Sequence, residues 1–405
     1  MLSVAEAAER ILERISVLDP LELSVSDAHG CVLAETVTAP EDLPPHPSAA
    51  SEGFALRSED TTHAGASPAS LTIIGEAAGG RPFAGRIAHG EAVRVSGGAT
   101  LPEGADAVVL RDDVAVVGSS MAIGRAVAHS DNVRPAGEDI ARGDPVMQEG
   151  QRIRGMDVGV LAALGRARVL VRPRPRVVAF AMGNELTEPG QPLSAGGVRD
   201  SNSFAIAGMT REAGAEPTRV GIVGTDASVL REKFRSYLPQ ADVFVVTGSL
   251  GADPDGPLRE VTEGLGEVDM WPISVSPGLS LAFGMIQGRP LFGLQETPVS
   301  VVLTYELFVR PALLKMGGRR TLTRPEVEGR MEDGVDHKAG REAYLRVRAW
   351  RDEQGWRARL SGRQGPGVIS SVAGANALAV LPSDRGNVAP GETVRLVLLE
   401  PLEGW

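Results

Sequence analysis

The chain has 405 residues, of which 42% are hydrophobic and 23% charged, and a formal net charge of −11. Because ordinary domains hold roughly 100–200 residues, this length predicts several domains, and the acidic charge argues against nucleic acid as a partner. Cys31 is the single cysteine, which excludes an intramolecular disulfide and a Cys-based zinc site. No export signal and no apolar run of about 18 residues is present, so we expect a cytoplasmic protein without a membrane span.

The first 172 residues read as a helix followed by mostly β-structure. Ser3 and Glu6 have the spacing of a capping box, and apolar residues at helical spacing continue to about Leu18. Short β-branched runs between turn clusters over residues 37–146 predict a small β-rich domain. The prolines of the Arg-Pro-Arg-Pro-Arg run at 172–176 favour an extended connector, so we place a domain boundary near residue 172.

The second half changes to alternating strands and helices. From residue 177 to about residue 316, apolar strand-like runs alternate with helix-like segments, which predicts a doubly wound, mostly parallel sheet. From residue 320 onwards the segments again read as strands separated by turns. This pattern predicts a small C-terminal β-domain.

Two glycine-containing loops follow predicted strands of the α/β region. Gly183, Asn184 and Glu185 follow the first strand, and the second loop, residues 247–256, contains Thr247, Gly248, Ser249 and Asp255. In a parallel sheet such loops meet at the carboxyl edge, where ligands bind, although a glycine turn after a strand can also be only structural. Neither loop carries the lysine of a phosphate-binding P-loop, and neither matches the dinucleotide-binding pattern.

Acidic turns in the β-rich half offer a second kind of site. Glu52 follows a proline-rich turn, and Asp139 lies in the run Gly-Glu-Asp at 137–139. Acidic turns are usually just solvated, but carboxylates on separate loops can also hold Mg²⁺ against a phosphate. The six histidines are scattered without a metal-binding spacing.

At this point the motifs resemble those of one family, the molybdopterin molybdenumtransferases (MoeA, gephyrin E-domain). Residues 51–57 resemble S-A-M-D-G-Y-A-V, residues 101–109 resemble the P-x-G-A-D-A-V-V segment, and residues 132–139 resemble N-[IV]-R-x-x-G-E-D. The later matches are to S-T-G-D-E-L at 181–186, D-[ST]-N at 200–202, T-G-G-x-S-x-G-x-x-D at 247–256, P-G-K-P at 277–278 and G-L-P-G-N-P-V-S at 293–300. The matches run in order over nearly the whole chain.

The resemblance implies an α/β multidomain fold with four domains. Residues 1–37 and 136–172 would form an elongated first domain, residues 38–135 an inserted β-rich domain, residues 173–318 the doubly wound molybdopterin-binding α/β domain, and residues 319–405 a C-terminal β-barrel. It also implies a homodimer with the active cleft between the third domain of one subunit and the second domain of the other. Other molybdenum cofactor biosynthesis proteins, or a molybdoenzyme, would be further partners.

The implied reaction is Mg²⁺-dependent and converts adenylylated molybdopterin and molybdate to molybdenum cofactor and AMP. The roles of the aligned motif residues imply that Asp139, Glu52 and Glu185 are catalytic and that Glu52 and Asp139 bind Mg²⁺. The pterin or phosphate contacts would be Gly183, Asn184, Asp200, Ser201, Thr247, Gly248, Ser249, Asp255, Pro277, Gly278 and Pro298.

The sequence departs from the family pattern where charge is needed. Glu52 and Asn184 stand where the motifs have Asp, and the two lysines that flank Pro-Gly align with Ser276 and Leu279. The motif P-G-N-P has become Gln-Glu-Thr-Pro at 295–298. Loss of a cation can remove several kcal/mol of transition-state stabilisation.

These departures leave two hypotheses open. The first is molybdate insertion by an active enzyme, favoured by the retained Asp139. The second is a catalytically impaired paralogue that binds molybdopterin or a partner protein as a carrier or scaffold, favoured by the loss of both lysines. A changed, less anionic substrate is a third, for which Asp253 and Glu296 would be suited.

Overall fold

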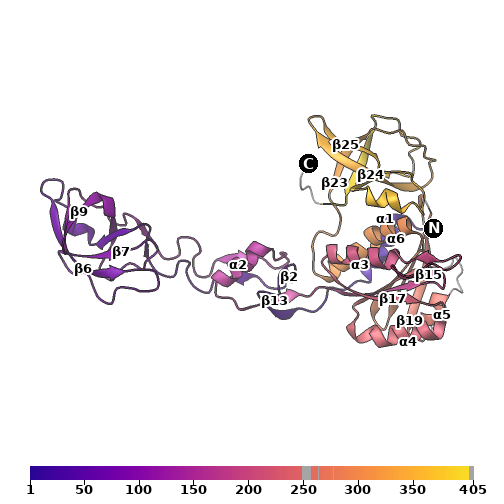
Figure 1. The fold of residues 1–405 in the computed structure, drawn as a ribbon, viewed down its shortest axis with the longest axis horizontal. Helices are drawn as coiled ribbons and strands as arrows, with labels where there is room; N and C mark the ends of the chain where they lie inside the picture. The colour runs from indigo at the N-terminus through magenta and orange to yellow at the C-terminus, as the bar shows by residue number, and fades with distance from the viewer. Residues whose placement is uncertain (249–256, 263, 277, 401–405) are drawn as a thin grey trace.

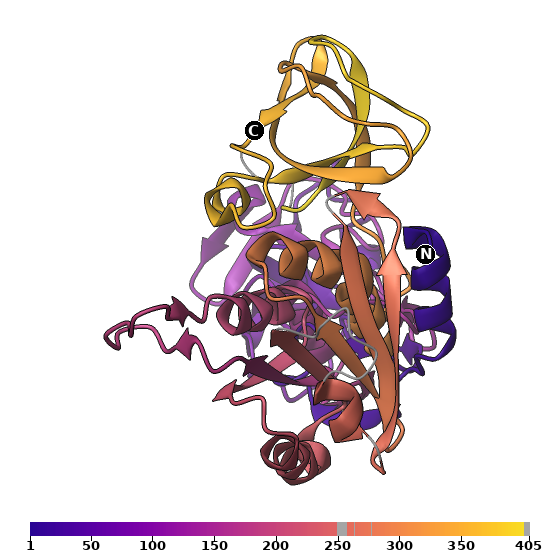
Figure 2. The same ribbon diagram turned by 90° about the vertical axis from the view of Figure 1, so that its right-hand side faces the viewer.

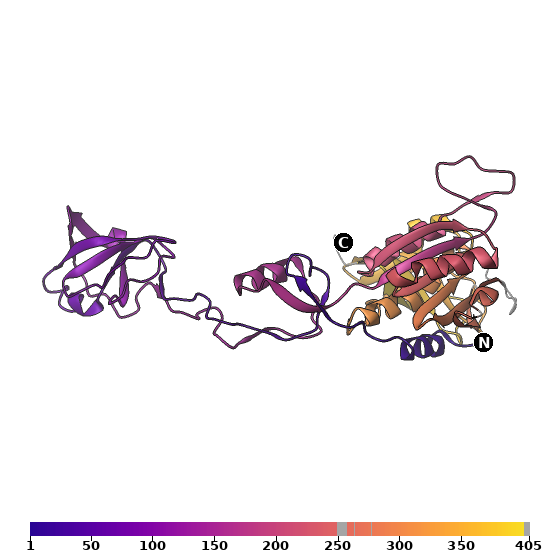
Figure 3. The same cartoon turned by 90° about the horizontal axis from the view of Figure 1, so that it is seen from below.

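The structure is a computed structural model that describes residues 1–248, 257–262, 264–276 and 278–400. The chain is elongated (Figure 1). A β-rich region lies at one end, a small region around α2 (Gly155–Ala163) lies in the middle, and an α/β region with a barrel beside it forms the other end. The view from below shows the same three parts in line (Figure 3).

The α/β region is built on a six-stranded sheet. Its strands lie in the order β17 (Glu216–Val223), β14 (Arg176–Met182), β18 (Val243–Gly248), β22 (Arg289–Leu294), β21 (Leu279–Ile286) and β19 (Gly266–Ile273). The first four strands are parallel. β21 is antiparallel to both of its neighbours, β22 and β19, so β19 runs in the same direction as the first four strands.

Helices cover both faces of this sheet because the strands are apolar on both sides. Val177 and Ala179 belong to a core shared with α3 (Asn202–Glu212), α6 (Pro298–Thr304) and α7 (Arg310–Met316). Val178 and Phe180 face the opposite way, into a core shared with α4 (Ala227–Tyr237) and α5 (Pro257–Thr262). Side chains alternate along a strand, and each large buried one contributes about 1.5–3 kcal/mol. The predicted doubly wound architecture is confirmed.

The N-terminal helix α1 (Val4–Glu13) packs against the α/β region. Its capping box, predicted from Ser3 and Glu6, is present. Ala7 and Ile11 are fully buried in the core of that region, and the Leu2 N–H donates to the Pro272 carbonyl at 3.0 Å. The helix ends at Glu13, before the predicted end near Leu18.

The middle region combines two distant stretches of the chain. Its small sheet has the order β1 (Leu21–Ser24), β13 (Arg168–Arg172), β2 (Val32–Leu33), and its core draws on residues 25–39 and 147–171. Cys31 lies in this core with 4% of its surface exposed, as an apolar filler. Burial raises the pKa of its thiol.

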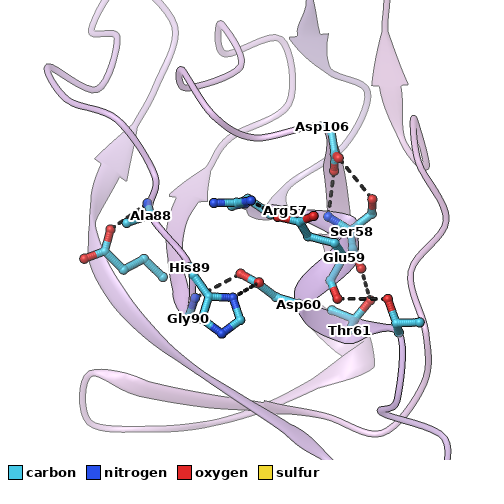
Figure 4. Close-up of polar contacts among 11 residues, drawn as sticks. Arg57, Ser58, Glu59, Asp60, Thr61, Ala88, His89, Gly90 and Asp106 are labelled. Atoms are coloured by element: carbon cyan, nitrogen blue, oxygen red, sulfur yellow. Dashed lines mark hydrogen bonds and ion pairs between the residues drawn. The ribbon is translucent and has the colours of Figure 1, made fainter.

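The β-rich region contains a six-stranded sheet with apolar residues on both faces. The strand order is β8 (Ala107–Leu110), β5 (Gly53–Leu56), β7 (Glu91–Val95), β6 (Ala69–Ala77), β10 (Ser120–Ile123) and β9 (Val114–Val117). The turn after β5 is fixed by carboxylates (Figure 4). Asp106 accepts from the Ser58 N–H at 2.7 Å, and the buried Asp60 carboxylate accepts from the Gly90 N–H at 2.9 Å and contacts His89.

The C-terminal region is a closed barrel of five strands, as predicted. The strands are β24 (Glu342–Asp352), β25 (Gly355–Leu360), β23 (Glu326–Met331), β27 (Thr393–Leu398) and β26 (Ala377–Leu381), and β26 pairs again with β24. The short strand β20 (Val275–Ser276), which leads from β19 to β21, pairs in parallel with β24. The barrel therefore shares backbone pairing with the segment between two strands of the large sheet (Figure 2).

Gly248 is a position where only glycine fits, since its φ is +149° and a Cβ would lie 2.2 Å from the Met182 carbonyl oxygen. We expect Gly248→Ala to destabilise the α/β region by about 2–5 kcal/mol through strain and a backbone clash. Hydrogen exchange of the β14 amides measures this. Gly208→Ala in α3, where a Cβ meets no atom within 4 Å, is the control and should stabilise by about 0.5–1 kcal/mol. Equal protection in both variants would contradict the argument.

Candidate functional site

The candidate site is the carboxyl edge of the large sheet. Parallel strands end at the same edge, so β14 delivers Gly183 to Glu185, β18 delivers Thr247 and Gly248, and β22 is followed by residues 295–298. This is the edge where open α/β sheets bind ligands. The first predicted loop and the described start of the second, Thr247 and Gly248, therefore follow neighbouring strands, and the segment before α6 lies beside them.

Asn202 ties these segments together. Its side-chain amide donates to the Thr247 hydroxyl oxygen at 3.2 Å and to the Glu296 carbonyl at 2.6 Å. The Thr247 hydroxyl donates in turn to the Gln295 carbonyl at 3.3 Å. Thr247 is 1% exposed, so these bonds satisfy a buried hydroxyl and fix the loop ends relative to each other.

In the loop after β14, the Glu185 side chain folds back so that its carboxylate lies beside Gly183. A Cβ at Gly183 would lie 2.5 Å from a Glu185 carboxylate oxygen, so a larger residue here would displace that carboxylate. The Asn184 amide donates to the Thr225 hydroxyl at 3.1 Å, which links the ends of β14 and β17. Asn184 and Glu185 are both exposed at the edge.

Asp200 is committed to contacts within the chain. It is 2% exposed, accepts from the Ser203 N–H at 3.0 Å in the first turn of α3, and lies 3.5 Å from Arg219. Arg219 also forms a bidentate ion pair with Glu188, in which its two Nη atoms each donate to one carboxylate oxygen at 3.0 Å. These contacts indicate that Asp200 holds the start of α3, while its neighbour Ser201 stays partly exposed beside it.

The remaining predicted contacts lie around the start of α6 and of β21. Pro298 is the first residue of α6, after the N-cap Thr297. Gly278 precedes β21, which runs antiparallel to β22, so Gly278 also lies at the carboxyl edge. Ser249, Asp255 and Pro277 lie outside the residues that the structure describes.

Glu52 and Asp139 belong to other parts of the elongated chain. Glu52 directly precedes β5 of the β-rich region. Asp139 lies in the segment that leads from the β-rich region back to the middle region, where its N–H donates to the Leu43 carbonyl at 3.1 Å. A single chain therefore does not bring either acid to the carboxyl edge (Figure 1).

Of the two acids expected to bind Mg²⁺, Glu52 fits that role poorly within one chain. One oxygen of Glu52 accepts from Arg94 at 3.2 Å and from Arg111 at 3.1 Å, and these bonds lower the pKa of Glu52. A divalent ion would have to compete with two guanidinium groups already neutralising this carboxylate. Within the described ranges no three His, Cys, Asp or Glu side chains are grouped so as to hold a metal. We therefore derive no step through Mg²⁺.

Two residues of the site were not among the sequence-based predictions. Asn202 completes the D-S-N motif directly after Ser201, so its motif could have pointed to it. Arg219 lies on β17, and its pairing with Asp200 depends on the order of strands, which the sequence pattern does not reveal.

Comparison with known families agrees with the fold in all three regions. Residues 2–165 match the MoeA N-terminal region (domain I and II), residues 179–315 match a probable molybdopterin binding domain, and residues 328–399 match the MoeA C-terminal region (domain IV). The fold and the carboxyl edge thus define a multidomain protein of the molybdopterin-binding class.

Comparison with individual relatives shows which family of this class the chain belongs to. The chain is 33% identical to molybdopterin molybdenumtransferase 1 of Mycobacterium tuberculosis over 98% of its own length and 99% of that protein, and 28% identical to molybdopterin molybdenumtransferase of Haemophilus influenzae over 98% of both. The chain belongs to the molybdopterin molybdenumtransferase (MoeA) family. The crystal structure of the molybdopterin biosynthesis MoeA protein from Pyrococcus horikosii is similar over 100% of both chains, with a TM-score of 0.85 and 29% identity.

Across the part of the chain that the structure describes, no helix combines the length and apolar character needed to cross a membrane.

Replacing Asn202 tests whether its amide holds the edge together. Asn202→Ala removes two hydrogen bonds, so we expect about 1–3 kcal/mol of lost local stability and faster amide exchange across residues 295–298. Asn387→Ala, which removes a side-chain bond to the His337 N–H in the barrel, is the control. Unchanged exchange at residues 295–298 in Asn202→Ala would show that the segments hold their positions without it.

Proposed function

We propose that this chain inserts molybdate into adenylylated molybdopterin and releases AMP, the reaction that gives its relatives their name. The observation that carries the proposal is the hydrogen-bonded convergence of three segments at the carboxyl edge, with Asn202 linking Thr247 to Glu296. Such an edge offers free backbone N–H groups to anions, as a nucleotide-bearing pterin requires. The match of residues 179–315 to molybdopterin-binding domains supports the same ligand.

In this proposal the residues of the edge bind and orient the substrate. Gly183, Asn184 and Glu185 would border the pterin on one side, with Thr247 and Gly248 in the centre and Ser201 and Pro298 on the other side. Ser249, Asp255 and Pro277 enter only through the resemblance, because they lie outside the described residues. Glu185 is an exposed carboxylate at this edge and is our candidate for moving a proton.

A homodimer is part of the proposal because a single chain leaves the site without Glu52 and Asp139. Within one elongated chain the β-rich region lies far from the carboxyl edge (Figure 1). The β-rich region of a second copy can reach this edge instead. We propose the four-domain division given above, with the cleft between the third domain of one subunit and the second of the other. We also propose a cytoplasmic location and transfer of the product to a molybdoenzyme or another cofactor biosynthesis protein.

Asp139 is the acid we propose for the partner's contribution. Its carboxylate makes no hydrogen bond or ion pair to any described residue, and it is exposed. Glu52, in contrast, is already neutralised by two arginines. A Mg²⁺ requirement is an expectation from the resemblance alone, and omission of the ion from the assay below tests it.

The test is AMP release from adenylylated molybdopterin in a single turnover with molybdate. We expect molybdate-dependent release, and a loss of about 100-fold or more in Asp139→Ala if its carboxylate acts on the reacting groups. Asp384→Ala, which changes an exposed acid of the barrel, is the matched control. Tight binding of the substrate without release would overturn the enzyme proposal and place the chain among carriers or scaffolds.

A further inference from the structure

The barrel meets the carboxyl edge of the large sheet along a seam. Two contacts form this seam. Strand β20 pairs with β24 so that Val275 lies opposite Glu342 and Ser276 opposite Ala343. The Val299 N–H in the first turn of α6 donates to the Pro366 carbonyl of the barrel at 3.2 Å. The barrel therefore contacts the edge at two places, at β20 just before β21 and at the start of α6.

Arg341, the residue before β24, extends from this seam toward the edge. One of its guanidinium nitrogens, Nη1, lies 3.6 Å from the position that a Cβ would take at Gly278. Leu281 pairs with Leu294, the last residue of β22, so the backbone before Leu279 reaches beyond the end of β22. The guanidinium is thus placed at the same edge as Thr247 and Glu185.

The guanidinium of Arg341 has no partner among the described residues. Only its backbone carbonyl is engaged, by the His337 Nε2 at 3.1 Å. Two other arginines of the barrel and its rim are paired with carboxylates, Arg324 with Glu306 at 2.9 Å and Arg385 with Glu392 at 2.7 Å. Arg219, the cation on β17, is neutralised by Glu188 and Asp200.

We propose that Arg341 binds a tetrahedral oxyanion at the carboxyl edge, either molybdate or the phosphoryl group of the adenylylated pterin. The inference rests on the proposed function and adds the residue that anchors its anion. A guanidinium offers five donors in a planar fork that matches two oxygens of an oxyanion. Ser276 and Leu279, which flank the Pro-Gly turn beside it, carry no charge. Arg341 supplies from the barrel the positive charge that this turn lacks.

Calorimetric titration of the full chain with molybdate alone, and separately with AMP, tests the proposal. In Arg341→Gln we expect about 10- to 100-fold weaker binding of one of the two, with partial recovery in Arg341→Lys, which keeps the charge but loses the fork. Loss for molybdate only identifies molybdate as the anion, and loss for AMP only identifies the phosphoryl group. Arg351→Gln, at the exposed far end of β24, is the control and should bind both as the unaltered chain does.

Several outcomes would overturn the assignment. These are unchanged binding of both anions in Arg341→Gln, equal weakening in Arg351→Gln, or no binding of either anion by the unaltered chain. Failure of the proposed function is a separate result. Binding that depends on Arg341 without AMP release would refute the enzyme but keep the anion site, whereas AMP release that is unchanged in Arg341→Gln would refute only the role of Arg341.

Discussion

The parallel pairing of β18 between β14 and β22 is the constraint on which the rest of the structure depends. These strands are buried on both faces, so a shift of one residue in register would turn each apolar set toward the wrong helix layer. The pairing brings Thr247 beside Ala181 and Leu294, and Gly248 beside Met182. The loop ends that form the site are therefore positioned by the core itself.

Polar groups at the edge are mostly satisfied within the chain. Asp200 caps the start of α3 and lies against Arg219, and Asn184 bonds to Thr225. The change from Asp to Asn at position 184 is consistent with this environment, because an amide can donate to the Thr225 hydroxyl oxygen where a carboxylate could only accept. Among the described residues of the edge, the exposed Glu185 and Glu296 and the unpaired Arg341 are charged groups through which the edge can respond to a ligand.

Much of the architecture could be predicted from sequence because local patterns report local physics. The apolar runs of β14 and β18 and the alternation with helices predicted a doubly wound sheet. The strand-like segments after residue 320 predicted a C-terminal β-domain, and the family resemblance implied that it is a barrel. The sequence pattern could not predict contacts between distant segments. The packing of α1 on the α/β core, the ion pairs of Glu52 with Arg94 and Arg111, and the pairing of β20 with β24 each join residues more than 40 positions apart.

The pairing of β20 with β24 has a mechanical consequence for the site. Because Ser276 is hydrogen-bonded into the barrel sheet while Leu279 begins a strand of the large sheet, the turn between them is held at both ends by different parts of the fold. A rotation of the barrel that keeps this pairing moves Ser276 together with Arg341, which directly precedes β24. A cation delivered by a lysine at position 279 would be positioned by the large sheet, to which Leu279 belongs. A cation delivered by Arg341 depends on the barrel as well, so the charge at the carboxyl edge is set by how the two regions dock.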